Sequence, residues 1–124
     1  MPHRALVAII DDDDSIRSAT GNLLEAAGYA TATFQSADEF LRAGSRHQVS
    51  CIVTDMRMPG MTGLDLFEAL VAANGAIPTV LVTAYPDEAV RMRARQAGIL
   101  CYLSKPFSPE ELCGCVDAAI ARAR

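Results

Sequence analysis

The chain has 124 residues and a formal net charge of −4. That length fits one compact domain, which would bury roughly two-thirds of the surface that its unfolded form exposes. The acidic balance argues against direct binding to nucleic acid, because phosphate backbones are bound by clustered Lys and Arg side chains.

Five apolar runs alternate with five helix-like stretches along the chain. The runs are rich in Val, Ile, Leu and Cys, with little polar alternation: Ala5 to Ile10, Tyr29 to Phe34, Cys51 to Thr54, Thr79 to Thr83 and Ile99 to Leu103. Strands that alternate with helices pair in parallel, and strands without polar alternation are covered by helices on both faces. The sequence therefore predicts a single α/β domain over residues 1–124, with a doubly wound five-stranded parallel sheet.

Cap residues mark where several helices begin and end. Residues 36–39 (Ser-Ala-Asp-Glu) and 108–111 (Ser-Pro-Glu-Glu) fit the capping box, in which Ser and Glu side chains bind free backbone N–H groups. We expect the first helix to begin near residues 13–15 and to stop before Gly28. Gly98 is expected to end the fourth helix in the same way.

Reactive side chains lie at or just beyond the carboxyl ends of four of the five apolar runs. They comprise an acid pair, a single acid, a hydroxyl and an amine: Asp11 and Asp12, Asp55, Thr83, and Lys105. The carboxyl ends of parallel strands form the binding crevice of such a sheet, so we expect these side chains to share one rim. Lys105 is the only lysine of the chain, which indicates a specific role rather than a scattered surface charge.

Carboxylates that are packed together repel one another unless a cation or protons intervene. Asp11, Asp12 and Asp55 are therefore candidate ligands of Mg²⁺, which prefers oxygen ligands and commonly uses one or two carboxylates plus a phosphate oxygen. Asp55 precedes a loop rich in Pro and Gly, a position that suits a carboxylate nucleophile able to form an acyl phosphate. Mg²⁺ and Lys105 would neutralise the negative charge of the transferred phosphoryl group.

Each of these motifs also has an ordinary explanation. An acidic tract such as Asp11 to Asp14 is usually a solvated loop or a helix cap. An Asp followed by a Pro-Gly turn, as at Asp55, is usually a turn former. The combination of strand-end residues, rather than any one of them, favours a site. Within the tract, Ile10 ends the strand, so Asp11 and Asp12 are expected at the rim and Asp13 and Asp14 at the helix start.

These residues, in this order and on these elements, closely resemble the receiver domain of two-component response regulators, and the resemblance covers essentially the whole chain. It implies a flavodoxin-like fold with strand order 2-1-3-4-5. Asp55 would be the phosphoacceptor, Asp12 a direct metal ligand, and Asp11 a ligand through water. The main-chain carbonyl of Arg57 would complete the protein's share of the metal shell.

The resemblance also implies a conformational switch. Lys105 would pair with the phosphoryl group, and Pro106 would be the family's cis-proline, which aims the lysine. Thr83 would donate its hydroxyl to a phosphoryl oxygen, and Tyr102 would swing inward as Thr83 leaves room. Arg57 and Tyr85 occupy variable positions beside the phosphorylation site, where bulky side chains are expected to slow attack by water.

The function implied is that of a phosphoacceptor switch in a His-to-Asp phosphorelay, with Mg²⁺ as cofactor and a sensor histidine kinase as donor. Such a domain would catalyse only its own phosphorylation and dephosphorylation. Phosphorylation-linked homodimerisation is expected through the fourth helix, fifth strand and fifth helix, including Arg91, Arg95, Tyr102 and Asp117. Receivers of nitrogen-fixation and nitrate-type transcriptional regulators are similar, and there the switch controls a separate DNA-binding domain.

Two other functions fit part of the pattern. A phosphatase of the haloacid dehalogenase type also uses a strand-end Asp and Mg²⁺, but it has a second Asp two residues after the nucleophile, where this chain has Arg57. In a receiver-like module that binds its partner constitutively, the acidic rim would be vestigial. The full set of five site residues argues against that alternative.

The cysteines and the apolar runs bear on location. Cys51, Cys101, Cys113 and Cys115 lie in apolar surroundings, and no secretory signal precedes the first strand, so we expect a reducing cytoplasm. No apolar stretch approaches the ~18 residues that span a bilayer, so no membrane segment is expected. Cys113 and Cys115 would point to different faces of one helix, which favours core packing for at least one of them over a metal or redox pair.

Overall fold

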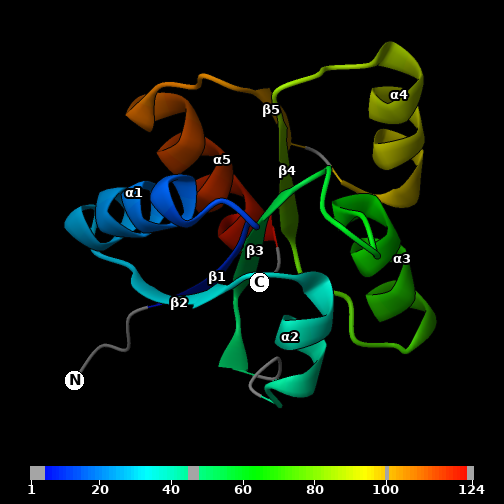
Figure 1. The fold of residues 1–124 in the computed structure, drawn as a ribbon, viewed down its shortest axis with the longest axis horizontal. Helices are drawn as coiled ribbons and strands as arrows, with labels where there is room; N and C mark the ends of the chain where they lie inside the picture. Colours follow the sequence, from blue (N-terminus) through cyan, green and yellow to red (C-terminus); the bar gives the residue numbers. More distant parts are fainter. Residues whose placement is uncertain (1–4, 45–47, 100, 123–124) are drawn as a thin grey trace.

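Strands and helices alternate strictly along the chain (Figure 1) in the computed structural model, which describes residues 5–44, 48–99 and 101–122. The strands are β1 (Leu6–Ile10), β2 (Ala30–Phe34), β3 (Cys51–Asp55), β4 (Thr79–Thr83) and β5 (Cys101–Ser104). The helices are α1 (Asp14–Ala26), α2 (Ala37–Arg42), α3 (Gly63–Ala72), α4 (Glu88–Ala97) and α5 (Pro109–Arg122). None of the helices in these ranges is long and apolar enough to cross a membrane.

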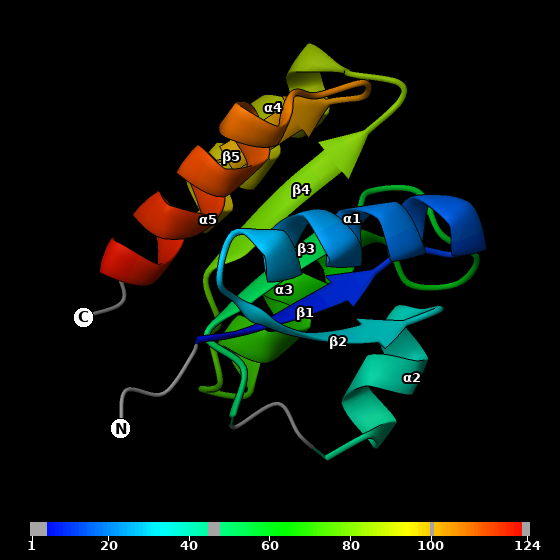
Figure 2. The same cartoon turned by 90° about the vertical axis from the view of Figure 1, so that its left-hand side faces the viewer.

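The five strands form one parallel sheet in the order β2-β1-β3-β4-β5, which confirms the predicted topology. Helices α1 and α5 cover one face, and α2, α3 and α4 cover the other (Figures 1 and 2). The order of the strands reverses at β1 and β3, which lie side by side. Ligands of open α/β sheets bind beyond the carboxyl ends of the strands at such a reversal.

Alternate residues of the central strands enter two different cores. In β1, Val7 and Ile9 belong to the core under α1 and α5, whereas Ala8 and Ile10 belong to the core under α2 and α3. All four side chains are nearly or completely buried. Burial on both faces explains why these strands carry no polar alternation.

The fifth strand begins later than the sequence predicts. Residue 100 lies outside the described part of the chain, and β5 runs from Cys101 to Ser104. Ile99 is 3% exposed and packs in a third core between α3, α4 and β4, although it precedes the strand. An apolar run therefore marked a buried segment here, but only part of that segment is strand.

The cysteines are free thiols that fill the core beneath α5. Cys51 is fully buried, and Cys101, Cys113 and Cys115 pack half-buried against the same core, so core packing holds for both cysteines of α5. Burial is the main reason why the pKa of Cys51 and that of Cys115 are each raised to about 12. These thiols behave as small apolar side chains.

The predicted cap residues lie at the helix ends, but only one of the two predicted capping boxes is complete in the described part of the chain. At α5, Glu111 N–H donates to Ser108 Oγ at 3.0 Å, and Ser108 N–H donates to the Glu111 carboxylate at 2.9 Å, which is the complete capping box. At α2, Glu39 N–H donates to Ser36 Oγ at 3.1 Å, which is the serine half of the box. Gly98 ends α4 with a φ of 118°, a left-handed conformation that suits glycine.

Helix α3 has a capping box that the sequence analysis did not identify. Asp65 N–H donates to Thr62 Oγ1 at 3.0 Å, and Thr62 N–H donates to the Asp65 carboxylate at 3.2 Å. Asp replaces the usual Glu in this box. The cap fixes the start of α3 directly beyond the loop that follows Asp55.

Gly63, the first residue of α3, packs against the end of β3. A Cβ atom at Gly63 would lie 2.7 Å from the main-chain oxygen of Asp55. It would also lie 2.8 Å from Leu81 Cδ2 and 3.0 Å from Thr54 Cγ2. These distances are too short for any residue with a side chain, so glycine permits α3 to approach Asp55.

Replacing Gly63 by Ala is therefore expected to lower the free energy of unfolding by about 1–3 kcal/mol, because α3 must shift away from β3. Gly114→Ala is the matched control, since a Cβ at Gly114 in α5 meets nothing within 4 Å. That change is expected to raise the free energy of unfolding by up to about 1 kcal/mol through helix propensity. Urea unfolding measures both, and equal stability of the two variants would contradict the packing argument.

Candidate metal centre

Three carboxylates meet at the carboxyl ends of β1 and β3. Oxygen atoms of Asp11, Asp12 and Asp55 all lie within 4.8 Å of one another. Asp11 is 4% exposed and Asp55 is 9% exposed, whereas Asp12 is open to solvent. The structure thus brings together the three acids that the sequence analysis named. Their ligand atoms are all carboxylate oxygens, which are the ligands that Mg²⁺ prefers.

The acidic tract divides between the rim and the start of α1. Asp13 is the N-cap of α1, and its carboxylate accepts a hydrogen bond from Ile16 N–H at 3.0 Å. Asp14 lies in the first helical turn, where a negative charge interacts favourably with the helix dipole. Asp11 and Asp12 remain for the rim, which is the predicted register.

Lys105 connects the acids from the opposite side of the rim. Its ammonium nitrogen lies 3.3 Å from an Asp11 oxygen and 3.6 Å from an Asp55 oxygen, and its side chain is 16% exposed. The following peptide bond, Lys105–Pro106, is cis. One amine cannot balance three carboxylates, so the cluster keeps an excess of negative charge.

The excess charge acts on the pKa of Asp55. Burial is the largest effect and raises the pKa of this carboxyl above its ordinary value of 3.8. The charges of Asp11 and Asp12 raise it further, while Lys105 and the N–H of Arg57 oppose the shift. A cation at the cluster would reverse the balance by favouring the ionised carboxylate. The residues present therefore fit a divalent metal ion in both ligand type and charge.

Thr83 lies beside this cluster at the end of β4. Its backbone neighbour Val82 pairs with Asp55 across the two strands. Thr83 is 1% exposed, and its hydroxyl accepts a hydrogen bond from Tyr85 N–H at 3.0 Å. Lys105 N–H donates to the Thr83 carbonyl at 2.8 Å. The hydroxyl and the amine predicted for the rim thus lie at the carboxyl ends of two adjacent strands, Thr83 as the last residue of β4 and Lys105 directly after β5.

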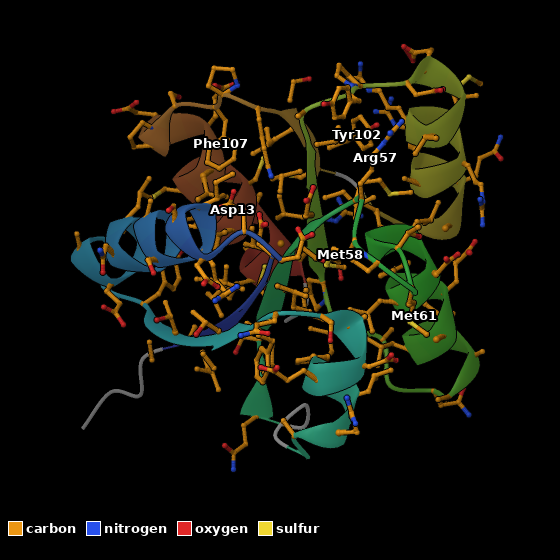
Figure 3. All side chains as sticks on the ribbon, viewed as in Figure 1. Asp13, Arg57, Met58, Met61, Tyr102 and Phe107 are labelled. Carbon is orange, nitrogen blue, oxygen red and sulfur yellow. The ribbon has the colours of Figure 1, made fainter. Side chains whose placement is uncertain are left out.

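Two aromatic residues link the loops around the rim. The guanidinium of Arg57 lies 4.8 Å from the centre of the Tyr85 ring, a cation–π contact between the loops after β3 and β4. The Tyr102 hydroxyl accepts a hydrogen bond from Asp87 N–H at 3.3 Å. Figure 3 labels Arg57 and Tyr102. The sequence placed Arg57 and Tyr85 together beside the phosphorylation site, but their stacking was not anticipated.

Sequence reasoning also missed Arg17. This residue of α1 donates to the main-chain carbonyl of Asp11 at 2.7 Å and forms an ion pair with Asp14. The signal was the spacing of three between Asp14 and Arg17, which places opposite charges on one helix face.

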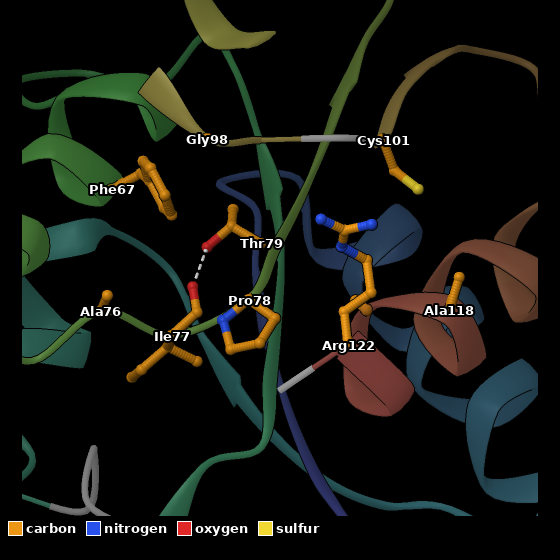
Figure 4. Close-up of a pocket in the computed structure, with 10 residues that line it drawn as sticks. Phe67, Ala76, Ile77, Pro78, Thr79, Gly98, Cys101, Ala118 and Arg122 are labelled. Atoms are coloured by element: carbon orange, nitrogen blue, oxygen red, sulfur yellow. Dashed lines mark hydrogen bonds between the residues drawn. The ribbon is translucent and has the colours of Figure 1, made fainter. Parts of the chain in front are cut away.

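A groove of about 580 Å³ lies at the other end of the sheet (Figure 4). Its lining includes Ile77 before β4, Thr79 at the start of β4, Cys101 at the start of β5, and Arg122 at the end of α5. A strand of five residues spans roughly 17 Å, so this groove is separate from the acidic rim. The candidate chemistry lies at the rim.

The fold and the rim define a doubly wound α/β domain whose acidic cluster lies where the strand order reverses. The chain matches the profile described as response regulator receiver domain over residues 7–117. It therefore belongs to the response regulator receiver domain family.

Relatives and solved structures agree with this membership. The chain is 37% identical over 121 residues to nodulation protein W of Bradyrhizobium diazoefficiens, covering 98% of this chain and 53% of that protein. It is 37% identical over 122 residues to transcriptional regulatory protein FixJ of Azorhizobium caulinodans, covering 98% and 58%. A response regulator receiver domain protein from Clostridium thermocellum matches with a TM-score of 0.88 and 27% identity over 96% of each chain. The chain spans about half the length of these two curated relatives.

The raised pKa of Asp55 leads to a prediction about stability. Asp55→Asn is expected to raise the free energy of unfolding of the metal-free protein at neutral pH, because the ionised carboxylate is less favourable in the fold than in the unfolded chain. The gain is absent well below pH 3.8, where both states are protonated. It grows as the pH rises through 3.8 toward the folded pKa, and it is complete above that pKa.

Urea unfolding in EDTA across this pH range measures the effect. Asp117→Asn, at an exposed position of α5, serves as the control and is expected to show no comparable gain. If Asp55→Asn is no more stable than the parent at pH 7, the charge imbalance described for the rim is wrong.

Proposed function

We propose that this protein is a phosphoacceptor switch of a two-component relay, in which Asp55 accepts a phosphoryl group from a phosphohistidine of a sensor kinase. The observation that carries the proposal is the convergence of Asp11, Asp12, Asp55 and Lys105 at the strand-order reversal of a receiver-family fold. Receiver domains act in signalling between kinases and output domains, which supports a regulatory role.

The residues of the rim divide the work of phosphoryl transfer. Asp11, Asp12, Asp55 and the main-chain carbonyl of Arg57 would hold Mg²⁺, which supplies positive charge to the transferred group. A carboxylate oxygen of Asp55 would attack phosphorus as the bond to the histidine nitrogen breaks. Lys105, which contacts both Asp11 and Asp55, would move its ammonium group onto a phosphoryl oxygen.

The switch would begin at Thr83. Its hydroxyl would turn from Tyr85 N–H to donate to a phosphoryl oxygen, which releases the start of the β4–α4 loop. Tyr102, whose hydroxyl accepts from Asp87 in the same loop, would then rotate inward. A local charge event would in this way alter the surface formed by α4, β5 and α5.

The wider role follows from the family. We propose that the domain catalyses only its own phosphorylation and dephosphorylation, and that it controls a DNA-binding output, on the same polypeptide or a separate one, without itself binding nucleic acid. The relatives are about twice as long as this chain, and one is named a transcriptional regulatory protein. We place the switch in the cytoplasm, a proposal that the four free thiols support.

Intact mass after incubation with Mg²⁺ and acetyl phosphate tests the proposal. We expect the parent to gain one phosphoryl group, and Asp55→Asn, Asp12→Asn and an EDTA-treated parent to gain none. A parent that binds Mg²⁺ but gains no mass from acetyl phosphate or from a phosphorylated histidine kinase would refute the phosphoacceptor role. It would leave the constitutive binding module as the better description.

The lifetime of the phosphorylated form gives a further prediction. Arg57 stacks on Tyr85, so both side chains would cover the acyl phosphate, and Arg57→Ala or Tyr85→Ala is expected to speed dephosphorylation several-fold. Because each substitution breaks the same contact, the double variant is expected to be little faster than either single variant. Decay of the phosphorylated mass measures the rates. Variants that decay no faster than the parent would contradict a covering role.

Phosphorylation is also expected to promote homodimerisation through α4, β5 and α5. Arg91 and Arg95 of α4 and Asp117 of α5 are exposed, so they offer charges of both signs to a second copy. Sedimentation is expected to become faster with Mg²⁺ and beryllofluoride, a phosphoryl mimic, and to stay unchanged in the Arg91→Glu, Arg95→Glu double variant. An unchanged sedimentation coefficient of the parent with the mimic bound would exclude this mode of dimerisation.

A further inference from the structure

We infer that Arg17 is a positioning residue for the metal centre: its guanidinium fixes the main chain between Asp11 and Asp12 and thereby sets where their carboxylates lie. The inference rests on the proposed function, because it assigns the residue to the same metal centre.

Arg17 is placed between the loop and the helix that follows it. Its Nη1 donates to the Asp11 carbonyl at 2.7 Å, and its Nη2 forms an ion pair with the Asp14 carboxylate. The Arg17 side chain is only 13% exposed, whereas that of Asp14 is 82% exposed. An arginine withdrawn from solvent loses hydration, which costs free energy unless its donors are hydrogen-bonded. The bond to the Asp11 carbonyl compensates for that loss, unlike an incidental ion pair on the surface.

The carbonyl that Arg17 binds belongs to the peptide group that joins Asp11 to Asp12. On the other side, Asp11 N–H donates to the Phe34 carbonyl at 3.1 Å and continues the pairing of β1 with β2. These two bonds hold the backbone of Asp11 at both ends. Because side-chain directions follow from the backbone, they also limit where the Asp11 and Asp12 carboxylates can point.

The remaining contacts of Asp11 differ from the Arg17 contact in an important respect. Lys105 binds one Asp11 oxygen at 3.3 Å, but the proposed mechanism moves Lys105 to the phosphoryl group. Asp13 N–H binds the other oxygen at 2.9 Å, and it is part of the same loop. Arg17 acts from α1 on the main chain, so its contact need not change when a metal ion or a phosphoryl group arrives.

The shape of the guanidinium explains why arginine suits this position. Its planar fork presents several donors at once, so one side chain reaches both the Asp11 carbonyl and the Asp14 carboxylate. A lysine would offer a single point charge and is expected to satisfy one partner at a time. Arg17→Lys should therefore lose part of the positioning effect.

Removing Arg17 is expected to change metal affinity in opposite directions, depending on whether the residue acts through its charge or by positioning the carboxylates. A guanidinium near the carboxylates repels a divalent cation, so loss of its charge alone would tighten metal binding. Loss of the positioning contact would weaken metal binding, because the carboxylates would no longer be held in place. Changing a residue that orients metal ligands typically weakens metal affinity about 10- to 100-fold. The direction of the change therefore distinguishes the two roles.

Binding of Mn²⁺, a hard cation that suits carboxylate ligands, can be followed by the loss of the free-ion electron paramagnetic resonance signal, with Mg²⁺ as competitor. We expect Arg17→Ala to bind Mn²⁺ about 10-fold or more weakly than the parent and Arg17→Lys to lie between them. Arg42→Ala is the matched control. Arg42 also donates to a main-chain carbonyl within its helix, that of Asp38 at 3.3 Å, but on α2 and in an exposed position.

Thermal unfolding of each metal-free variant separates positioning from folding. A purely structural role would lower the melting temperature and leave the affinity of the folded protein unchanged. If Arg17→Ala does not fold, Arg17→Lys and Arg17→Gln provide the test, and weaker binding by both supports the inference. Unchanged or tighter binding in every folded Arg17 variant would overturn it.

If the proposed function is wrong, metal binding across the variants follows a different pattern. If the parent binds no Mn²⁺ or Mg²⁺, or if Asp12→Asn and Asp55→Asn bind as tightly as the parent, the metal centre itself is wrong, and the Arg17 inference falls with it. If those two variants lose binding while the Arg17 variants keep it, only the role of Arg17 is refuted.

Discussion

Electrostatic repulsion among Asp11, Asp12 and Asp55 is the constraint on which the rest of the site depends. Adjacent parallel strands bring the acids together, and Gly63 lets α3 pack closely against the main chain of Asp55. Lys105 relieves part of the repulsion, but one amine leaves an excess of negative charge. Holding the three acids together therefore lowers the free energy of unfolding. A divalent cation and a transferred phosphoryl group would complete the site.

The loops around the rim are joined to one another rather than held separately. Tyr85 contacts Arg57 through its ring and the Thr83 hydroxyl through its backbone N–H, so it links the loop after β3 to the end of β4. Tyr102 holds the same loop from β5 through Asp87. A change at Thr83 would thus reach both the Arg57–Tyr85 contact and the surface near α4. In the proposed switch, this continuity would connect a charge at Asp55 to the surface near α4.

The sequence predicted features that depend on residue type and order. Apolar runs without alternation gave the sheet, and the polar residues that end those runs gave the rim, including the buried Asp11 and Asp55. Contacts that depend on side-chain direction in space were not predictable in this way. The reach of Arg17 back to the Asp11 carbonyl and the stacking of Arg57 on Tyr85 are of this kind. The late start of β5 was missed because apolar residues also fill buried loops.

The pKa of Asp55 tests this account most directly, because both metal binding and phosphoryl acceptance are attributed to the charge imbalance at the rim. It can be measured by nuclear magnetic resonance of the labelled carboxyl carbon during a pH titration, in EDTA and with Mg²⁺ present. The account predicts a pKa above 3.8 in EDTA and a lower value with Mg²⁺, since the cation favours the ionised carboxylate. An ordinary pKa that does not respond to Mg²⁺ would contradict it.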